Sequence, residues 1–177
     1  MFAGWENFYF MLGSAAAALI GLLFIVVTLT AGSERSSSLR GQSIYLTPQA
    51  VHFGVVVALS AIAIAPQQGR LIPTAMFALG DLVGLGNAIR TGVGVRGLRR
   101  TAADPPHWTD MWAYALIPGG VYAGLTAAIA GMGLGWAWGV KLAGVALLGL
   151  LLIGIRNAWD LVTWLAARPT PQIGPPP

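Results

Sequence analysis

Uninterrupted apolar runs recur along the chain, and the first of them, from Phe8 to Ala31, contains no charged residue. A run of about 18 residues or more, at roughly 1.5 Å per residue, can cross a hydrocarbon core of about 30 Å as a helix. Only 9% of the 177 residues are charged, whereas about a quarter are charged in an average soluble domain. A soluble domain of this size could not bury so much apolar surface. We therefore expect a multi-pass membrane protein.

The apolar runs predict an all-helical bundle of five transmembrane helices, because separate segments in lipid must satisfy their backbone hydrogen bonds internally. Thr47 is the expected N-cap of the second helix, with Pro48 at its first position, and Thr109 or Asp110 is the expected N-cap of the fourth. Residues 1–168 are expected to form one domain, followed by a Pro-rich, disordered tail at 169–177. The predicted spans are residues 8–31, 48–66, 73–95, 110–131 and 135–160, and the helical pattern of the last continues to about residue 167.

The arginines indicate how these spans are oriented, because short cytoplasmic connections accumulate Lys and Arg. Only Arg70 falls on one side of the predicted spans. This distribution places the N-terminus outside and the C-terminus in the cytoplasm. It also favours five spans over four, because a re-entrant second run would put the later arginine clusters on the wrong side of the membrane. The arginines on the predicted cytoplasmic side are Arg35, Arg40, Arg96, Arg99, Arg100, Arg156 and Arg168.

The third span carries three polar residues, Asp81, Asn87 and Arg90. Asn87 shares a helical face with Gly80 and Gly84, so this small-residue face is predicted to pack on another helix. Asp81 and Arg90 are nine residues apart, on opposite sides of one helix, and cannot pair with each other. Arg90 lies close enough to the cytoplasmic surface for its head group to reach water.

Asp81 is predicted to lie near the middle of the membrane, where an ionised carboxylate costs roughly 3 kcal/mol on insertion scales. The simplest partner is Lys141, the only lysine in the chain, on the fifth span. The pair would serve either as a structural contact or in the movement of an ion or proton.

A second polar group lies at the end of the fifth span, in the sequence "GIRNAWDLVTW". Arg156 and Asp160 are four residues apart on one helical face, Asn157 lies beside them, and Arg90 of the third span could reach Asp160. Two interpretations remain open: an ion pair at the membrane interface, or a polar cluster at the cytoplasmic mouth of a pathway.

Small residues also repeat at four-residue spacing in three of the predicted spans. Such faces allow helix backbones to approach closely, either within one bundle or between subunits. Pro118 in the fourth span removes a backbone donor, so a kink is expected there; an unwound segment is the alternative. The repeating residues are Gly13, Ala17 and Gly21; Gly120, Gly124 and Ala128; and Gly131, Gly135, Gly139 and Ala143.

The "NAWD" sequence in the fifth span and the start "FYFMLGSAAAALIGLLFIVVTL" resemble a family of small, uncharacterised bacterial multi-pass membrane proteins. The resemblance covers mainly these two ends of the chain. It implies the cytoplasmic (inner) membrane of a bacterium and carries no activity.

Catalytic and cofactor motifs are largely missing from the sequence. There is no cysteine, no Gly-rich loop after a strand and no Ser in a nucleophile motif. Asp81 lacks a second carboxylate at its depth, so we expect no enzyme activity. His52 and His107 are expected to be ordinary structural residues and not haem ligands, and no metal or other cofactor is expected. Because the net charge of +4 comes from loop arginines, nucleic-acid binding is not expected.

After enzymes, cofactor proteins and nucleic-acid binders are set aside, two hypotheses about the function remain. The first is a channel or transporter, built as a homo-oligomer in the lipid bilayer, that moves an ion or a small solute. The second is a non-transporting assembly or regulatory subunit of a membrane complex.

The arginine distribution generates a test of topology. A reporter fused after Pro177 should be cytoplasmic, whereas a reporter fused before Met1 should not, because the arginine-rich connections stay inside. Alkaline phosphatase and fluorescent-protein fusions at the two ends report these locations. A cytoplasmic N-terminus would refute the five-span topology.

Overall fold

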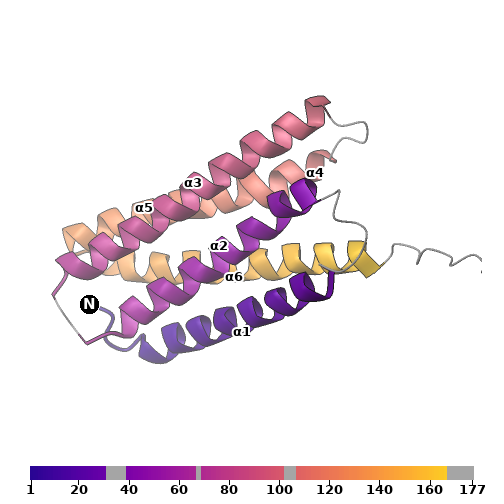
Figure 1. Cartoon of the computed structure of the whole chain (residues 1–177). Coiled ribbons are helices and arrows are strands. Elements are labelled where there is room, and N and C mark those ends of the chain that lie inside the picture. The colour runs from indigo at the N-terminus through magenta and orange to yellow at the C-terminus, as the bar shows by residue number, and fades with distance from the viewer. Residues whose placement is uncertain (31–38, 67–68, 102–106, 167–177) are drawn as a thin grey trace, which may run out of the picture.

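A computed structural model describes residues 1–30, 39–66, 69–101 and 107–166, and all regular structure within these ranges is helical. The predicted tail at 169–177, Arg35 and Arg168 lie outside the described residues. Figure 1 shows the helices side by side in one bundle. The elements are α1 (Glu6–Thr30), α2 (Leu39–Ile64), α3 (Leu71–Thr101), α4 (Trp108–Met111), the π-helix η2 (Trp112–Leu116), α5 (Ile117–Leu134) and α6 (Ala137–Ala166).

Five helices of the described chain are long and apolar enough to cross a membrane, and they indicate a multi-pass membrane protein. The fourth of these consists of α4, η2 and α5, which follow one another without a break. The apolar segments are Glu6–Thr28, Thr47–Ile64, Leu71–Arg100, Trp108–Leu134 and Ala137–Asp160. They match the predicted spans to within a few residues, except that the helices at the third and fourth positions extend further.

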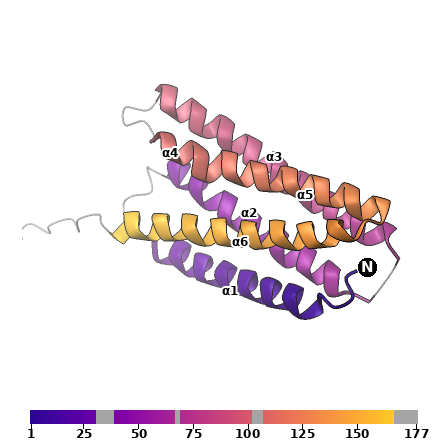
Figure 2. The ribbon, with the colours of Figure 1, turned by 180° about the vertical axis from the view of Figure 1, so that it is seen from behind.

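The helices form a ring in which α2 and α6 also touch across the centre. Going around the ring, α1 packs on α2, α2 on α3, α3 on α5, α5 on α6, and α6 on α1. Figures 1 and 2 show the same order from opposite sides, with α1 and α3 at the two flanks of the bundle. We call the end where α1, α3 and α6 begin the Arg70 end, and the opposite end the Arg156 end.

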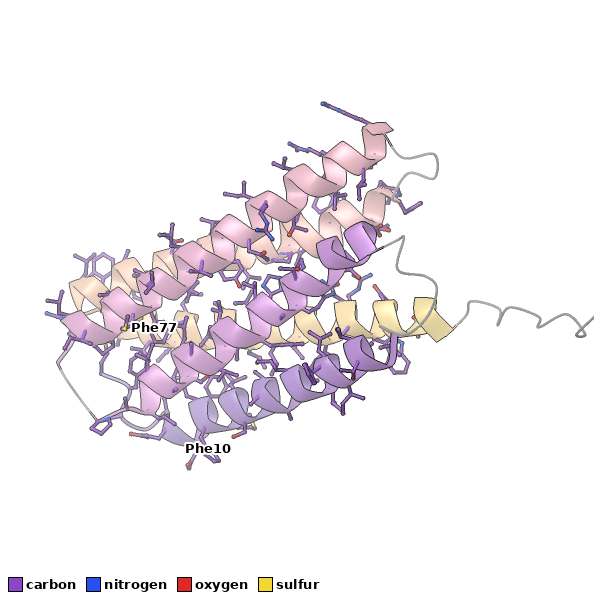
Figure 3. The ribbon with its side chains drawn as sticks, in the orientation of Figure 1. Phe10 and Phe77 are labelled. Carbon is purple, nitrogen blue, oxygen red and sulfur yellow. The ribbon has the colours of Figure 1, made fainter. Side chains whose placement is uncertain are left out.

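Large apolar side chains occupy both the interior and the exterior of the bundle. Phe77 of α3 is fully buried, whereas Phe10 of α1 is 64% exposed, and Figure 3 shows Phe10 pointing away from the bundle. The buried N-terminal residue Phe2 stacks on Phe77 and meets the edge of Tyr9, with ring centroids 5.5 and 5.3 Å apart. Aromatic side chains therefore close the core at the Arg70 end, while the apolar exterior fits a lipid environment.

The predicted start of the second helix is wrong, because α2 begins at Leu39 and contains Pro48 in its interior. Thr47 is therefore not an N-cap. In water an internal proline usually ends a helix, since it lacks an N–H group and its ring clashes with an earlier carbonyl. In a membrane helix the loss is tolerated, because the alternative of exposing several backbone groups to lipid costs more.

The predicted N-cap of the fourth helix is also wrong, by two or three residues. His107 has an extended backbone and its Nδ1 accepts a hydrogen bond from the Thr109 N–H, 3.4 Å away. Thr109 could not cap the helix because it already lies in the first turn, as does Asp110. Histidine was overlooked because Ser, Thr, Asp and Asn are the common capping residues.

Pro118 follows the π-helix η2 and lies in the first turn of α5. The Ile117 N–H donates to the Trp112 carbonyl, five residues earlier. The backbone is therefore not unwound at Pro118, because α4, η2 and α5 follow one another without a break from Trp108 to Leu134. The expected kink at Pro118 stays a prediction. Because Pro118 has no N–H group and Ile117 bonds to Trp112, the carbonyl of Ala113 must find a donor outside this helix.

The hairpin of α5 and α6 depends on glycines where the two backbones meet. A Cβ atom added at Gly139 would lie 2.6 Å from the Met132 backbone nitrogen and 2.9 Å from the Ala128 carbonyl oxygen. Gly135 has a φ of 80° and caps α5, since its N–H and that of Trp136 bond to carbonyls of the last turn. Glycine is the residue that adopts this left-handed conformation without strain.

Small-residue faces pack as predicted in some helices but not in all. An added Cβ at Gly13 would meet Ser60 at 3.1 Å, one at Gly80 would meet Leu59 at 2.9 Å, and one at Gly84 would overlap the ring of Tyr122. These contacts confirm that the third span packs through its small face. By contrast, an added Cβ at Gly120 or Gly124 would meet nothing within 4 Å.

The different surroundings of two glycines generate a stability test. Gly139→Ala should lower the free energy of unfolding by about 1–3 kcal/mol, because the new methyl group meets backbone atoms that cannot move independently. The matched control is Gly86→Ala on α3, which adds the same methyl group at an exposed position with nothing within 4 Å and should be neutral or raise stability, since Ala favours helices by about 1 kcal/mol over Gly. Thermal unfolding in detergent measures both. Equal effects at the two positions would show that the α5 and α6 backbones are not in close contact.

Candidate functional site

Six polar side chains lie on the helices α2, α3 and α5, two pairs of them joined by hydrogen bonds, and we call this group the polar core. Three of them, His52, Asp81 and Tyr122, are titratable, and all three are almost completely buried. The helices that carry them are otherwise apolar in this region. The members are Gln49 and His52 on α2, Asp81 and Asn87 on α3, and Tyr122 and Thr126 on α5.

His52 and Tyr122 link α2 to α5. The Nδ1 atom of His52 lies 2.9 Å from the hydroxyl oxygen of Tyr122, and both side chains are fully buried. Gly84 of α3 provides the space for the tyrosine ring, because any side chain at this position would overlap it. A proton can lie on either atom of this hydrogen bond, since an imidazole nitrogen and a phenol hydroxyl can each donate or accept.

Asp81 and Thr126 link α3 to α5. The Thr126 Oγ1 atom lies 2.6 Å from the Asp81 Oδ2 and 3.1 Å from the Tyr122 carbonyl oxygen. A hydroxyl has one hydrogen to donate but can also accept. When Asp81 is ionised, Thr126 can donate to it; when Asp81 is protonated, Thr126 can accept from it and donate to the Tyr122 carbonyl. Both protonation states of Asp81 are therefore hydrogen-bonded without any rearrangement of the helices.

Several atoms of the polar core have no hydrogen-bond partner among the described residues. They are the amide oxygen and nitrogen of Gln49, the His52 Nε2, the Asp81 Oδ1 and the Asn87 Nδ2. A buried polar atom without a partner costs about 1–3 kcal/mol, and more in a region without water. The polar core thus has more hydrogen-bonding capacity than its own side chains satisfy.

The packing register places His52 and Asn87 at similar depth in the bundle. Leu59 of α2 meets Gly80 of the antiparallel helix α3. Seven residues along each helix, about 10 Å further towards the Arg156 end, lie His52 and Asn87. Gln49 is one helical turn beyond His52. The unpartnered atoms of α2 and α3 therefore form a polar layer inside the bundle, with Asp81 on the side of the Arg70 end.

The expected pair between Asp81 and Lys141 is wrong: Asp81 bonds to Thr126, and Lys141 is exposed at the Arg70 end. The helix order explains the difference, because α3 packs on α2 and α5 and not on α6. The sequence gives the depth of each residue in a span but does not state which helices are neighbours.

Asn157 of α6 has a role that the sequence did not reveal. Its side chain is fully buried and its Nδ2 donates to the Ala113 carbonyl oxygen at 3.0 Å. The Ala113 carbonyl is the one left without a helical donor by η2 and Pro118. In return, the Tyr114 hydroxyl donates to the Asn157 backbone carbonyl at 3.3 Å. Asn157 therefore stabilises the π-helix from the neighbouring helix.

The predicted pair between Arg156 and Asp160 is confirmed, with 3.0 Å between the Arg156 Nη2 and the Asp160 Oδ2. The Arg156 Nη1 also donates to the Asn157 Oδ1 at 3.1 Å. About half of each charged side chain is exposed, so this pair is worth little stability by itself. Arg90 forms no ion pair with Asp160 within the described chain, because Asp160 is engaged by its own helix.

The sequence contained a signal for the polar core that was not used. Gln49 and His52 are three residues apart in an apolar span, and Tyr122 and Thr126 are four residues apart in another. Each spacing puts two polar side chains on one helical face. His52 was considered only as a haem ligand. Within the parts of the chain that the structure describes, no three His, Asp or Glu residues are grouped as a metal site.

The fold indicates a multi-pass helical membrane protein, and its helices carry a buried, titratable hydrogen-bond network. Comparisons of the chain with protein-family models, with curated proteins and with solved structures give no match. Its function must therefore be inferred from its own residues.

The contact between Thr126 and Asp81 can be tested by an isosteric substitution. Thr126→Val should lower the free energy of unfolding by about 1–3 kcal/mol, because the buried carboxyl group of Asp81 loses the hydrogen bond from Thr126, a residue that is itself exposed. Thr126→Ser, which keeps the hydroxyl, should recover most of the loss.

The matched control is Thr28→Val on α1, where the exposed hydroxyl bonds only to carbonyls of its own helix. This control should change stability by less than about 0.5 kcal/mol. Chemical or thermal unfolding in detergent is the measurement. Equal stability of Thr126→Val and the wild type would mean that Asp81 obtains its partner from another group.

Proposed function

We propose that the protein moves an ion or a small solute across the bacterial cytoplasmic membrane, and that the transported species passes through the polar core. The supporting observation is the set of buried polar atoms without partners on Gln49, His52, Asp81 and Asn87. Polar side chains that only hold helices together satisfy one another's hydrogen bonds. In a site that receives water or a transported species, by contrast, some polar atoms have no protein partner and can bond to that water or species.

Among the species that such a core can pass, a proton fits best. Asp81 and Thr126 accommodate a bound or a released proton with the same atoms in place. His52 is a second titratable group, joined to Tyr122 by a hydrogen bond. Ionisable residues within membrane spans commonly form proton relays of this composition. The core has no group of carboxylates that would bind a metal cation, judging from the described residues.

The orientation that accompanies this proposal puts the N-terminus outside and the C-terminus in the cytoplasm. The supporting observation is that Arg96, Arg99 and Arg100 in the last turns of α3 and Arg156 on α6 lie at the same end of the bundle. Arginine-rich ends face the cytoplasm. Protons would then enter at the Arg70 end, pass Asp81 before His52, and leave near Asn157.

The second candidate is a non-transporting assembly subunit, and one observation favours it. A Cβ atom added at Gly120 or Gly124 of α5 would meet nothing within 4 Å among the described residues. Small residues on a membrane helix allow another helix to approach closely, either from a second copy of this chain in a homo-oligomer or from a different protein. Both candidates predict association, but only the first predicts activity of the purified protein by itself.

A liposome assay distinguishes the two candidates. Purified protein reconstituted in vesicles with an imposed membrane potential should acidify the lumen, reported by a trapped pH-sensitive dye. Asp81→Asn should reduce the rate by about tenfold or more, because the amide has nearly the same shape but cannot carry the proton. The matched control is Glu6→Gln, which removes an exposed carboxylate of α1 and should keep the wild-type rate.

Two results would count against the proposal. A wild-type rate equal to that of empty vesicles, in protein that is folded by circular dichroism, would favour the assembly subunit. A normal rate in Asp81→Asn would exclude Asp81 from the pathway.

A further inference from the structure

A pocket of about 410 Å³ opens at the Arg70 end of the bundle, separate from the polar core. It lies between the start of the chain, the turn that joins α5 to α6, and the residue that precedes α3. Arg70 and Lys141 both line it, and they come from segments 71 positions apart in the sequence. The fold therefore brings the two cationic side chains of this end to one cavity.

Neither cation is neutralised by the described chain. No carboxylate of the described residues lies within ion-pair distance of Arg70 or Lys141. Both residues are exposed, so their charges face the pocket and the solvent or head-group region beyond it. Two positive charges that share a cavity repel each other unless an anion lies between them.

The guanidinium group of Arg70 lies beside the turn that ends α5. One of its nitrogens occupies the space where any residue other than glycine at position 135 would place a Cβ atom. Gly135 is also the residue with positive φ that ends α5, so both the turn and this position of the arginine require glycine there. A guanidinium group presents a planar set of donors suited to two oxygens of one anion.

The start of α6 adds to the positive potential. Lys141 is four residues into α6, a helix of 30 residues, and Trp136 and Ala137 at its start also line the pocket. The first turn of a helix has backbone N–H groups without helical acceptors and a positive dipole end. A helix N-terminus with two cationic side chains beside it is a favourable place for a phosphate group.

The other walls are aromatic and apolar. Trp5 and Trp136 line the sides, and Met132 and Val140 lie deeper in the bundle. Tryptophan is enriched at the depth of lipid head groups, where its ring lies in apolar material and its N–H group reaches polar atoms. A ligand with a charged end and an apolar remainder fits this lining.

We propose that the Arg70–Lys141 pocket binds a phosphate group. Two sources have this chemistry, the head group of an anionic phospholipid and free phosphate, and the apolar walls favour the lipid. The proposal does not depend on proton movement through the polar core, because it rests on different residues at the end of the bundle.

The test measures binding to the full-length protein in a neutral detergent. The probes are short-chain phosphatidylglycerol, diacylglycerol with the same acyl chains, and inorganic phosphate. Native mass spectrometry counts bound lipid, and the shift in unfolding temperature reports all three probes. The wild type should bind phosphatidylglycerol and not diacylglycerol. Stabilisation by inorganic phosphate alone would identify free phosphate as a sufficient ligand, whereas its failure would assign the site to the lipid.

Variants connect the binding to this pocket. Arg70→Gln combined with Lys141→Gln should weaken phosphatidylglycerol binding by about tenfold or more, since two charge-assisted contacts are lost. The matched control is Arg99→Gln, an exposed arginine at the other end of α3, which should bind as the wild type does. Both substituted residues are exposed, so folding should be retained.

Either of two results would overturn the proposal. The first is equal binding of phosphatidylglycerol and diacylglycerol by the wild type, which would show that the phosphate is not recognised. The second is unchanged binding by the double variant, which would place any lipid elsewhere on the bundle.

Discussion

The structure depends on one constraint: inside a lipid layer, polar groups obtain hydrogen-bond partners from the protein or from water that the protein admits. The polar core shows this at the contacts of α2, α3 and α5. Tyr122 reaches His52 only because Gly84 leaves room for its ring. Thr126 sits one helical turn further along α5 and bonds to Asp81. Two hydrogen bonds between helices therefore join α5 to α2 and to α3, and the apolar side chains pack around these contacts.

The same constraint accounts for the irregular backbone of the fourth span. Pro118 has no N–H group, and the wide turn before it directs the Ile117 N–H to Trp112, so the Ala113 carbonyl lacks a donor within its helix. Asn157 supplies that donor from α6. The contact ties the Arg156 end of α5 to α6, while the close backbone approach at Gly139 ties their other ends. A helix with a proline in lipid is thus kept continuous by a buried amide on the helix beside it.

Sequence reasoning was reliable where length and spacing decide the outcome. The five spans follow from the apolar runs, the packing of Gly80 and Gly84 from their shared face, and the pair of Arg156 with Asp160 from their spacing of four. It failed where the outcome depends on which helices are neighbours. Asp81 and Lys141 lie on α3 and α6, which the helix order separates, and no pattern along the chain states that order. It also failed at two helix starts, where another residue than the predicted one begins or caps the helix. The helix α2 begins before Pro48 and continues through it, and His107 caps α4.

The central claim is that water reaches the polar layer of the bundle although the outer surface of α3 faces lipid. The natural chain has no cysteine, so single cysteines can be introduced without background reaction. A thiol reacts as its thiolate, which forms in water and not in hydrocarbon. In membrane vesicles, a water-soluble methanethiosulfonate reagent should therefore modify Asn87→Cys, which faces the polar layer, and should leave Ile89→Cys unmodified, since Ile89 is 61% exposed on the outer surface. An unreactive Asn87→Cys beside a reactive Ile89→Cys would contradict the account, because it would show a dry core and a third helix that lies in water.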